Sequence, residues 1–265
     1  MGETNLPKEI NNILKNYSLT KIILYKDQPS IVYKATKNSC PTYFLKIDSS
    51  LKPEKERLIW LKDKLNVPEV IAFFQNGNKD YLLLSEIPGK NLIDPNLKLN
   101  PNNLVKVYAN GLKIIHNLSH TKCPFDSTTD VLIKKSKKII INNQLDHSAL
   151  SSEYKLKSFK ELLDELSSLQ PTLEDNVFIH GDYSMPNIIM NKEEIGFVDF
   201  GLAGIGDRYV DLSIASRSIK YNLGEEWVSP FFESYGIVPD KNKLRFFLLL
   251  DQFVMMRSSI KKQTL

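Results

Sequence analysis

Apolar and polar residues alternate through much of the first third of the chain, and this alternation predicts short β-strands. We predict strands over residues 30–36, 42–47, 69–75 and 80–85. A turn at Asn76-Gly77-Asn78 joins the last two strands, because Asn-Gly pairs favour tight hairpin turns. Residues 53–65 carry an apolar stripe at helical spacing, with a proline in the first turn, and this pattern predicts a helix. This part of the chain is therefore expected to be β-rich with one helix.

The pattern changes after residues 87–89, where a Pro-Gly pair indicates a hinge. Beyond it, apolar residues recur mostly at helical spacing. We predict helices over residues 100–118, 127–142, 151–169, 209–221, 224–235 and 240–260. Two short apolar runs, 177–180 and 195–200, are predicted as strands that flank a loop and form a small inserted hairpin. The predicted fold class is α+β, with a β-rich lobe over residues 1–87 and a mainly helical lobe over residues 88–265.

The composition narrows the class of protein. Hydrophobic residues make up 42% of the 265 residues, which is enough for a packed core and argues against a disordered chain. A net charge of +4 without long runs of like charge gives no reason to expect nucleic acid as a partner. The chain begins without a signal-peptide pattern, and charged residues interrupt its most apolar stretch, residues 244–256. We therefore expect a cytoplasmic protein with no membrane partner, a monomer or weak dimer, whose Cys40 and Cys123 are reduced.

The most informative stretch is residues 177–202, VFIHGDYSMPNIIMNKEEIGFVDFGL. The tripeptide HGD at 180–182 follows the first apolar run, Asn187 comes five residues after its aspartate, and Asp199 begins the sequence DFG. Each short motif alone is compatible with an ordinary turn or a strand cap. Together, at this spacing, they match the H-x-D, N and D-F-G motifs of the protein-kinase signature set.

These residues supply what the transfer of a phosphoryl group to a hydroxyl requires. Asp182, on a loop after a strand, can accept the proton of the attacking hydroxyl. Asn187 and Asp199 provide an amide and a carboxylate oxygen, and magnesium takes such ligands together with phosphate oxygens. We interpret His180 as a structural histidine that hydrogen-bonds the loop. The sequence therefore predicts a kinase that uses a nucleotide and Mg²⁺.

A kinase of this kind also needs a lysine and a glutamate from its β-rich part to handle the nucleotide phosphates. Lys46 ends an alternating run and Glu54 begins the next predicted helix, so the two are candidates for this ion pair. Without the motifs at 180–199, we would interpret each as a solvated surface side chain, which is the more common place for both residue types. Protein kinases cover the phosphates with a glycine-rich loop, but residues 26–30 contain no glycine, and the Ser30 hydroxyl is the candidate contact.

The chain also resembles the aminoglycoside 3'-phosphotransferases, small-molecule kinases with a two-lobed, protein-kinase-like fold. The run GDRYVDLSIASRSI at 206–219 carries the resemblance most specifically. The segments IVYK, FLK, WLKDKL and LLLSE, with Cys123-Pro124 and Leu250-Asp251, extend it over nearly the whole chain. The HGDxxxxN and DxG elements alone are shared by many small-molecule kinases.

The resemblance implies a nucleotide-binding lobe at residues 1–87 and a lobe with the catalytic loop and substrate site at 88–265. It implies that Asp182 is the catalytic base, that Asn187 and Asp199 are the magnesium ligands, and that Lys46 and Glu54 are the phosphate lysine and its partner. Phe44 falls where the family stacks an aromatic ring on adenine. Ser85 and Ile87 match hinge positions whose backbone pairs with the base.

A polycationic substrate calls for an acidic binding site. Glu225, Glu226 and Asp251 match the family's substrate-binding acids, and ionised Asp182 would add to their negative charge. Glu225 and Glu226 also suit the N-terminus of a helix, where negative charge is favourable. The two interpretations are compatible with each other.

Together these observations predict an aminoglycoside phosphotransferase that confers antibiotic resistance. It would transfer the γ-phosphoryl group of ATP or GTP, with Mg²⁺, to a hydroxyl of a kanamycin-type antibiotic, expected to be the 3'-hydroxyl. Leu202 and Gln252 stand where the family commonly has an arginine and a second acid. The alternatives are a kinase of the same fold for choline, homoserine, a macrolide or a sugar, and a nucleotide-binding pseudokinase. The acids argue against the aromatic cage that choline favours, and the presence of all the expected polar residues argues against a pseudokinase.

Overall fold

The computed structural model describes residues 6–22, 30–141 and 154–260. The chain forms two compact units. Unit 1 is the chain up to Pro88 together with Gly196–Gly201, and unit 2 is Gly89–Ile195 together with the chain from Leu202 onward. The roles predicted for residues 1–87 and 88–265 stay predictions.

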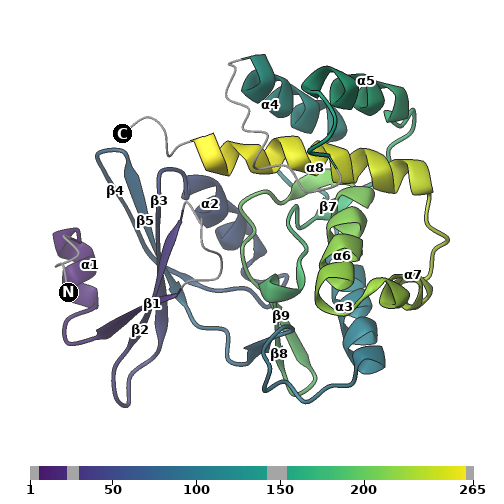
Figure 1. Ribbon diagram of the computed structural model, residues 1–265. Coiled ribbons are helices and arrows are strands. Elements are labelled where there is room, and N and C mark those ends of the chain that lie inside the picture. Colours follow the sequence, from purple (N-terminus) through teal and green to yellow (C-terminus); the bar gives the residue numbers. More distant parts are fainter. Residues whose placement is uncertain (1–5, 23–29, 142–153, 261–265) are drawn as a thin grey trace. The chain divides into compact units, whose positions relative to one another are not determined.

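Unit 1 is built on an antiparallel sheet with the strand order β1-β2-β3-β5-β4. Its strands are Ser18–Ile22 (β1), Ile31–Thr36 (β2), Tyr43–Asp48 (β3), Val70–Asn76 (β4) and Lys79–Ser85 (β5). Helices α1 (Lys8–Ile13) and α2 (Lys52–Leu61) lie on either side of this sheet (Figure 1). The four predicted strands and the helix behind Pro53 are confirmed, whereas α1 and β1 are additional to the sequence prediction.

Alternation along β3 separates the two faces of the sheet. Leu45 and Ile47 point into a core that α1 covers, and both are buried. That core also contains Leu6, Ile10, Leu14, Ala35, Tyr81 and Leu83. Phe44 and Lys46 alternate with these residues, and they therefore point to the opposite face. The strand register places Lys34 and Leu84 directly beside Phe44 on that face.

Unit 2 is mainly helical. Its α-helices are Pro101–His116 (α3), Thr129–Ile141 (α4), Phe159–Leu169 (α5), Tyr209–Asn222 (α6), Val228–Tyr235 (α7) and Lys241–Ile260 (α8). α8 packs against α6 on one side and against α4 and α5 on the other (Figure 1). α3 packs against α7. The predicted α+β fold class is confirmed by the sheet of unit 1 and the helices of unit 2.

The predicted hairpin of strands 177–180 and 195–200 is wrong. β7 (Asn176–Ile179) pairs with β10 (Gly204–Asp207), whereas β9 (Glu194–Phe197) belongs to another sheet with β6 (Lys90–Asn91) and β8 (Ile188–Asn191). β9 ends at Phe197 because the chain turns away there, and Asp199 has a φ of 71°, outside the range of a strand. The two apolar runs are strands, but their partners are different segments.

Side-chain caps decide where several helices begin. The Asn100 side chain accepts a hydrogen bond from the Asn103 amide at the start of α3, as an N-cap does. Ser158 and Glu161 form a capping box, so α5 begins at Phe159 and not at residue 151. Residues 142–153, which include parts of two predicted helices, lie outside the described ranges. The predicted helix 224–235 starts as a 3₁₀ turn, η3 (Glu225–Trp227), which leads into α7.

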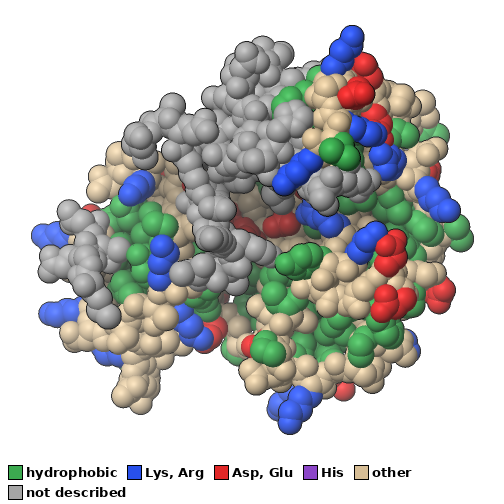
Figure 2. Space-filling view, in the orientation of Figure 1, with side chains coloured by type: hydrophobic (Ala, Val, Ile, Leu, Met, Phe, Trp, Pro, Cys, Tyr) green, Lys and Arg blue, Asp and Glu red, His purple; other side chains and the backbone are tan. Residues whose placement is uncertain are grey.

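Three other expectations concern the surface and the thiols. Neither Cys40 nor Cys123 is joined in a disulfide in the described part of the chain. In the part of the chain that the structure describes, no helix combines the length and apolarity needed to cross a membrane. On the visible face of each unit, lysine and arginine side chains are scattered and form no single patch (Figure 2).

Candidate active site

The loop after β7 carries Asp182, and a buried carboxylate from α6 holds the residues just before it. Asp211 accepts hydrogen bonds from the backbone amides of His180 at 2.7 Å and Gly181 at 2.8 Å. Gly181 has a φ of 82°, and a Cβ atom there would lie 2.6 Å from the Leu202 carbonyl oxygen. Only glycine fits this turn without strain. The entry to the loop that carries Asp182 is therefore fixed through its backbone.

His180 is completely buried, and its Nδ1 atom accepts a hydrogen bond from the Asp182 amide at 3.2 Å. An imidazole nitrogen that accepts a hydrogen bond carries no proton. His180 therefore forms the predicted hydrogen bond with the loop, and its structural role stays a prediction.

Asn187 fixes the side chain of Asp182. It ends the 3₁₀ turn η2 (Met185–Asn187), and its Nδ2 atom donates to the Asp182 carbonyl oxygen at 2.9 Å and to Oδ2 at 3.0 Å. Because the amide nitrogen makes both bonds, the amide oxygen is the atom that Asn187 can offer to a cation. The structure thus brings the predicted base and one predicted metal ligand together.

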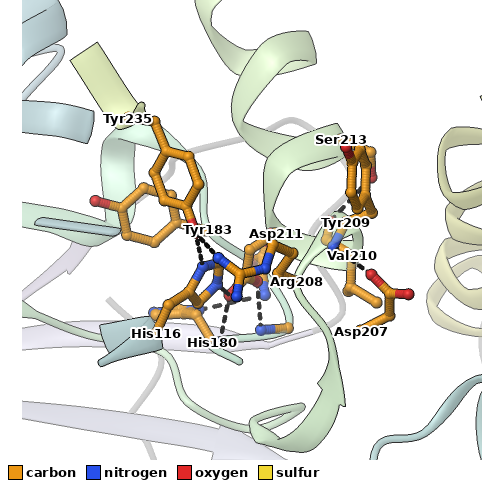
Figure 3. A network of polar contacts seen from close by, with 12 residues as sticks. His116, His180, Tyr183, Asp207, Arg208, Tyr209, Val210, Asp211, Ser213 and Tyr235 are labelled. Carbon is orange, nitrogen blue, oxygen red and sulfur yellow. Dashed lines mark hydrogen bonds and ion pairs between the residues drawn. The ribbon is translucent and has the colours of Figure 1, made fainter. Parts of the chain in front are cut away.

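Further polar residues, which the sequence analysis did not single out, surround the Asp211 carboxylate (Figure 3). His116 on α3 contacts it through Nε2 at 3.1 Å, and His116 Nδ1 lies 2.7 Å from the Tyr235 hydroxyl. Arg208 donates to the same hydroxyl at 2.9 Å and forms an ion pair with Asp175. An aspartate within the apolar run YVDLSIAS was the available signal for a buried acid, because such a residue needs partners.

In unit 1, Lys46 lies between two carboxylates. Its Nζ atom is 2.6 Å from Glu54 Oε1 and 3.2 Å from Asp199 Oδ1. Burial works against the charge of Lys46, but Asp199 and Glu54 raise its pKa above the usual value, so the ammonium form persists. Burial also raises the pKa of the Glu54 carboxyl, which Lys46 opposes and Asp199 reinforces. The predicted Lys46–Glu54 ion pair is present, and α2 supplies the glutamate.

The other nucleotide candidates lie in the same unit. Phe44 is on the sheet face that carries Lys46, and the Lys34 ammonium lies 5.6 Å from the centre of its ring. The Ser30 hydroxyl donates to the Asp48 carboxylate, while the rest of the predicted phosphate loop, residues 26–29, lies outside the described ranges.

The two hinge candidates lie at the end of β5 and just beyond it. Ser85 exchanges hydrogen bonds with Glu69 through its amide, at 3.0 Å, and its hydroxyl, at 2.8 Å. Ile87 packs on Gly196, where a Cβ atom would lie 2.7 Å from the isoleucine side chain. Both residues also line a surface hollow next to the end of α2. Their role in binding a base stays a prediction.

The three predicted substrate acids differ in their surroundings. Asp251 on α8 is buried and forms an ion pair with Arg217 of α6. Burial of Arg217 opposes its charge, but Asp251 and Asp182 raise the pKa of its guanidinium. In contrast, Glu225 and Glu226 are exposed at the start of η3, and Glu225 pairs with Lys220.

Asp251 lies close to the loop that carries Asp182. It lines a small cavity of about 30 Å³ together with Gly181 and Leu202. The remaining walls of this cavity are apolar and come from β7, α4, α6 and α8. The structure therefore places one of the three acids next to the loop, with its charge already balanced by an arginine.

The chain is similar to known phosphotransferases over most of its length. The model of the family described as "Phosphotransferase enzyme family" matches residues 29–247. An aminoglycoside 3'-phosphotransferase from Niallia circulans is 35% identical over 259 residues, which covers 94% of this chain and 97% of the relative. One from Enterococcus faecalis is 29% identical over 265 residues, covering 95% and 99%.

Solved structures show the same fold. The crystal structure of an aminoglycoside 3'-phosphotransferase of type VIII gives a TM-score of 0.78 at 24% identity and covers 89% of this chain and 93% of its own. An aminoglycoside phosphotransferase from Streptomyces rimosus, in complex with ADP and streptomycin, gives 0.76 at 21% identity, covering 92% and 95%. The protein-kinase-like fold class predicted from the sequence is confirmed.

Proposed function

Because this chain belongs to the phosphotransferase enzyme family, and within it to the aminoglycoside 3'-phosphotransferases, we propose that it phosphorylates a kanamycin-type antibiotic. The γ-phosphoryl group of a nucleotide would pass to the 3'-hydroxyl of the antibiotic, and the product would confer resistance. The observation that carries this proposal is the Asp182 carboxylate, held by Asn187 on a loop whose entry is anchored by Asp211. The cytoplasm is the proposed compartment, because ATP and GTP are available there.

Asp182 is the proposed catalytic base. A carboxylate at the end of a fixed loop can orient the sugar hydroxyl and take its proton as the bond to phosphorus forms. The Asn187 amide holds one carboxylate oxygen, Oδ2, and so presets the rotamer of the base. Such presetting removes the need to order the carboxylate during the reaction.

Lys46 is the proposed contact for the nucleotide phosphates. It stays charged between Glu54 and Asp199, and a fixed ammonium can stabilise the negative charge of phosphate oxygens. Glu54 would hold the lysine in place. A bound ADP in the Streptomyces rimosus relative supports a nucleotide as the donor.

Asn187 and Asp199 are the proposed magnesium ligands, and their chemistry fits the ion. Magnesium prefers oxygen donors and usually takes only one or two from carboxylates. Asn187 offers its amide oxygen and Asp199 a half-exposed carboxylate. When bound, the ion would neutralise charge on the phosphate oxygens.

The remaining proposed contacts bind the nucleotide and the antibiotic. Phe44 would stack on the nucleobase, the Ser85 and Ile87 backbone would pair with its edge, and Ser30 would contact phosphate. Glu225, Glu226 and Asp251 would bind ammonium groups of the antibiotic, since carboxylates attract a polycation. A monomer or weak dimer that binds no nucleic acid stays a prediction.

The test measures ADP and GDP release by the purified protein with Mg²⁺. The substrates are kanamycin, the 3'-deoxy aminoglycoside tobramycin, and choline. Asp182→Ala is the variant, and Asp164→Ala, an exposed aspartate on α5, is the matched control. We expect turnover with kanamycin but not with tobramycin or choline, abolished in Asp182→Ala and retained in Asp164→Ala.

Each other result has a defined meaning. Turnover with tobramycin would move the reaction to a hydroxyl other than the 3'-hydroxyl. Turnover with choline alone would replace the antibiotic by a quaternary ammonium substrate. Full activity of Asp182→Ala would remove Asp182 as the base.

A further inference from the structure

Two buried tyrosines, one on α3 and one in the loop that carries Asp182, have no part in the proposed chemistry. Tyr108 is in the middle of α3, and Tyr183 directly follows Asp182. Both are completely buried. A buried hydroxyl costs free energy unless it forms a hydrogen bond, so each must be matched with a partner.

The two tyrosines are each other's partners. The Tyr108 hydroxyl donates to the Tyr183 carbonyl oxygen at 2.6 Å, and the Tyr183 hydroxyl donates to the Tyr108 carbonyl oxygen at 2.7 Å. Their rings stack with centroids 4.7 Å apart and planes inclined by 15°. We call this reciprocal pair the tyrosine clasp. It joins residues 75 positions apart in the chain.

The clasp uses a helical carbonyl oxygen that can accept a second hydrogen bond. A carbonyl inside a helix accepts one bond within the helix and has a second lone pair. The Tyr183 hydroxyl donates to this second lone pair of the Tyr108 carbonyl oxygen, and this bond attaches the loop to a rigid helix. Burial raises the pKa of both phenols well above the usual value, so both hydroxyls keep the proton that they donate.

A second attachment lies just beyond the clasp. The Ser218 hydroxyl on α6 accepts a hydrogen bond from the Met185 amide at 3.0 Å. The backbone is therefore held at Tyr183 and Met185 after Asp182, and Asp211 holds His180 and Gly181 before it. Asp182 is enclosed by attachments on both sides.

We propose that Tyr108 and Tyr183 are positioning residues that fix the direction of the Asp182 carboxylate by holding Tyr183, the residue that follows it. This proposal rests on the proposed function, in which Asp182 is the base. If the clasp opens, the Tyr183–Ser184 peptide and the Tyr183 side chain lose their attachment to α3, and the backbone that carries the Asp182 carboxylate can shift with them. Small displacements of a catalytic group reduce the rate strongly, while contacts to nucleotide and antibiotic elsewhere remain.

The test uses Tyr108→Phe, Tyr183→Phe and the double variant, which keep the rings and remove only the hydroxyls. Tyr209→Phe is the matched control, because Tyr209 is also buried in unit 2 and its hydroxyl accepts from the Asp240 amide at 2.9 Å. The measured quantities are the single-turnover rate of phosphoryl transfer to kanamycin, KM for both substrates, and amide hydrogen exchange of residues 180–187.

We expect each clasp variant to lose about tenfold or more in single-turnover rate with nearly unchanged KM values. The rate loss in the double variant should be smaller than the product of the two single losses, because the two hydroxyls hold the same contact between the loop and α3. Exchange over residues 180–187 should quicken in the clasp variants and stay unchanged in Tyr209→Phe.

Unchanged rates in folded clasp variants would overturn the proposal, as would equal losses in Tyr209→Phe. A wild-type protein that phosphorylates no aminoglycoside would overturn the proposed function instead. In that case amide hydrogen exchange still tests the clasp, because the measurement needs no turnover. Unchanged protection of residues 180–187 in the clasp variants would refute the proposed role of the clasp.

Discussion

Lys46 in unit 1 and Asp182 in unit 2 are held in place by different forces. Lys46 is positioned by opposite charges, Glu54 at 2.6 Å and Asp199 at 3.2 Å. Asp182 is positioned by hydrogen bonds from Asn187 and by a backbone that Asp211 anchors. The Lys46 ammonium carries three rotatable donors and tolerates small shifts of its partners, whereas the planar amides that hold Asp182 and its loop donate in fixed directions.

The difference suits the two proposed tasks. A lysine that holds phosphates must accommodate an incoming group of high negative charge, and the half-exposed Asp199 leaves room for that exchange. A base must point at one proton, which calls for a single geometry. We therefore expect changes in the Asp211 network to affect stability and rate together, and changes at Lys46 to affect the handling of nucleotide.

The largest effect is expected from Asp211→Ala. This change leaves the amides of His180 and Gly181 and the ring of His116 without their shared acceptor in a fully buried place. Loss of one member of such a network costs about 3–5 kcal/mol. We expect a fall of that size in the free energy of unfolding, measured by urea titration, with a loss of turnover.

Asp211→Asn is the informative companion, because it keeps one acceptor oxygen and removes the charge. It should recover part of the stability. Equal stability of wild type and Asp211→Ala would show that the loop does not depend on this carboxylate.

The next effect is expected from Lys46→Met, which keeps the length of the side chain and removes the charge. Loss of a preorganised charge at a transition state costs about 2.7–4 kcal/mol, or roughly 10²–10³-fold in rate. We expect this loss in kcat/KM for the nucleotide. Lys79→Met, at an exposed lysine on the same sheet, is the control and should retain activity. A fall in both variants would point to the sheet and not to the charge.

A smaller effect is expected from pH. The pKa of Glu54 is raised above the usual value of about 4.3, so Glu54 takes up a proton at a higher pH than an exposed glutamate. As the pH falls through this raised value, Lys46 loses the charge of its partner, and KM for the nucleotide should rise. In Glu54→Gln the rise should vanish, and KM should be high at every pH. An acid limb that persists in Glu54→Gln would assign the titration to another group.

The smallest effect is expected at Glu165 on α5, a residue with no proposed role in the reaction. Burial opposes its ionisation, but hydrogen bonds from Lys157 and Arg245 lower the pKa of its carboxyl. A carboxyl with a lowered pKa stabilises the fold above its usual pKa, and this contribution is lost as the pH falls through the folded value. Glu165→Gln should therefore cost about 1 kcal/mol or less near neutral pH and nothing at strongly acidic pH. The free energies of unfolding of wild type and Glu165→Gln, measured between these two pH limits, check this prediction. A difference between the two proteins that grows toward acidic pH would contradict it.

The strands of unit 1 show how far the pattern of a sequence reaches. β2 to β5 were predictable because one buried face imposes a period of two. α1 escaped prediction because it is short, and its Ile10 is identified as core only by the sheet against which it packs. The hairpin was predicted wrongly because β7 pairs with β10, and alternation within a strand does not name its partner.

The sequence by itself determined which groups are available for the chemistry. Asp182, Asn187 and Asp199 are recognisable because they occur at a characteristic spacing along one stretch of chain, and Lys46 and Glu54 because they end one element and begin the next. Only the tertiary structure decided what holds them. The contacts of Asp211, Tyr108 and Arg217 join residues between 30 and 95 positions apart. Such pairs depend on which helices pack together, and packing is set by the whole core and by no local pattern.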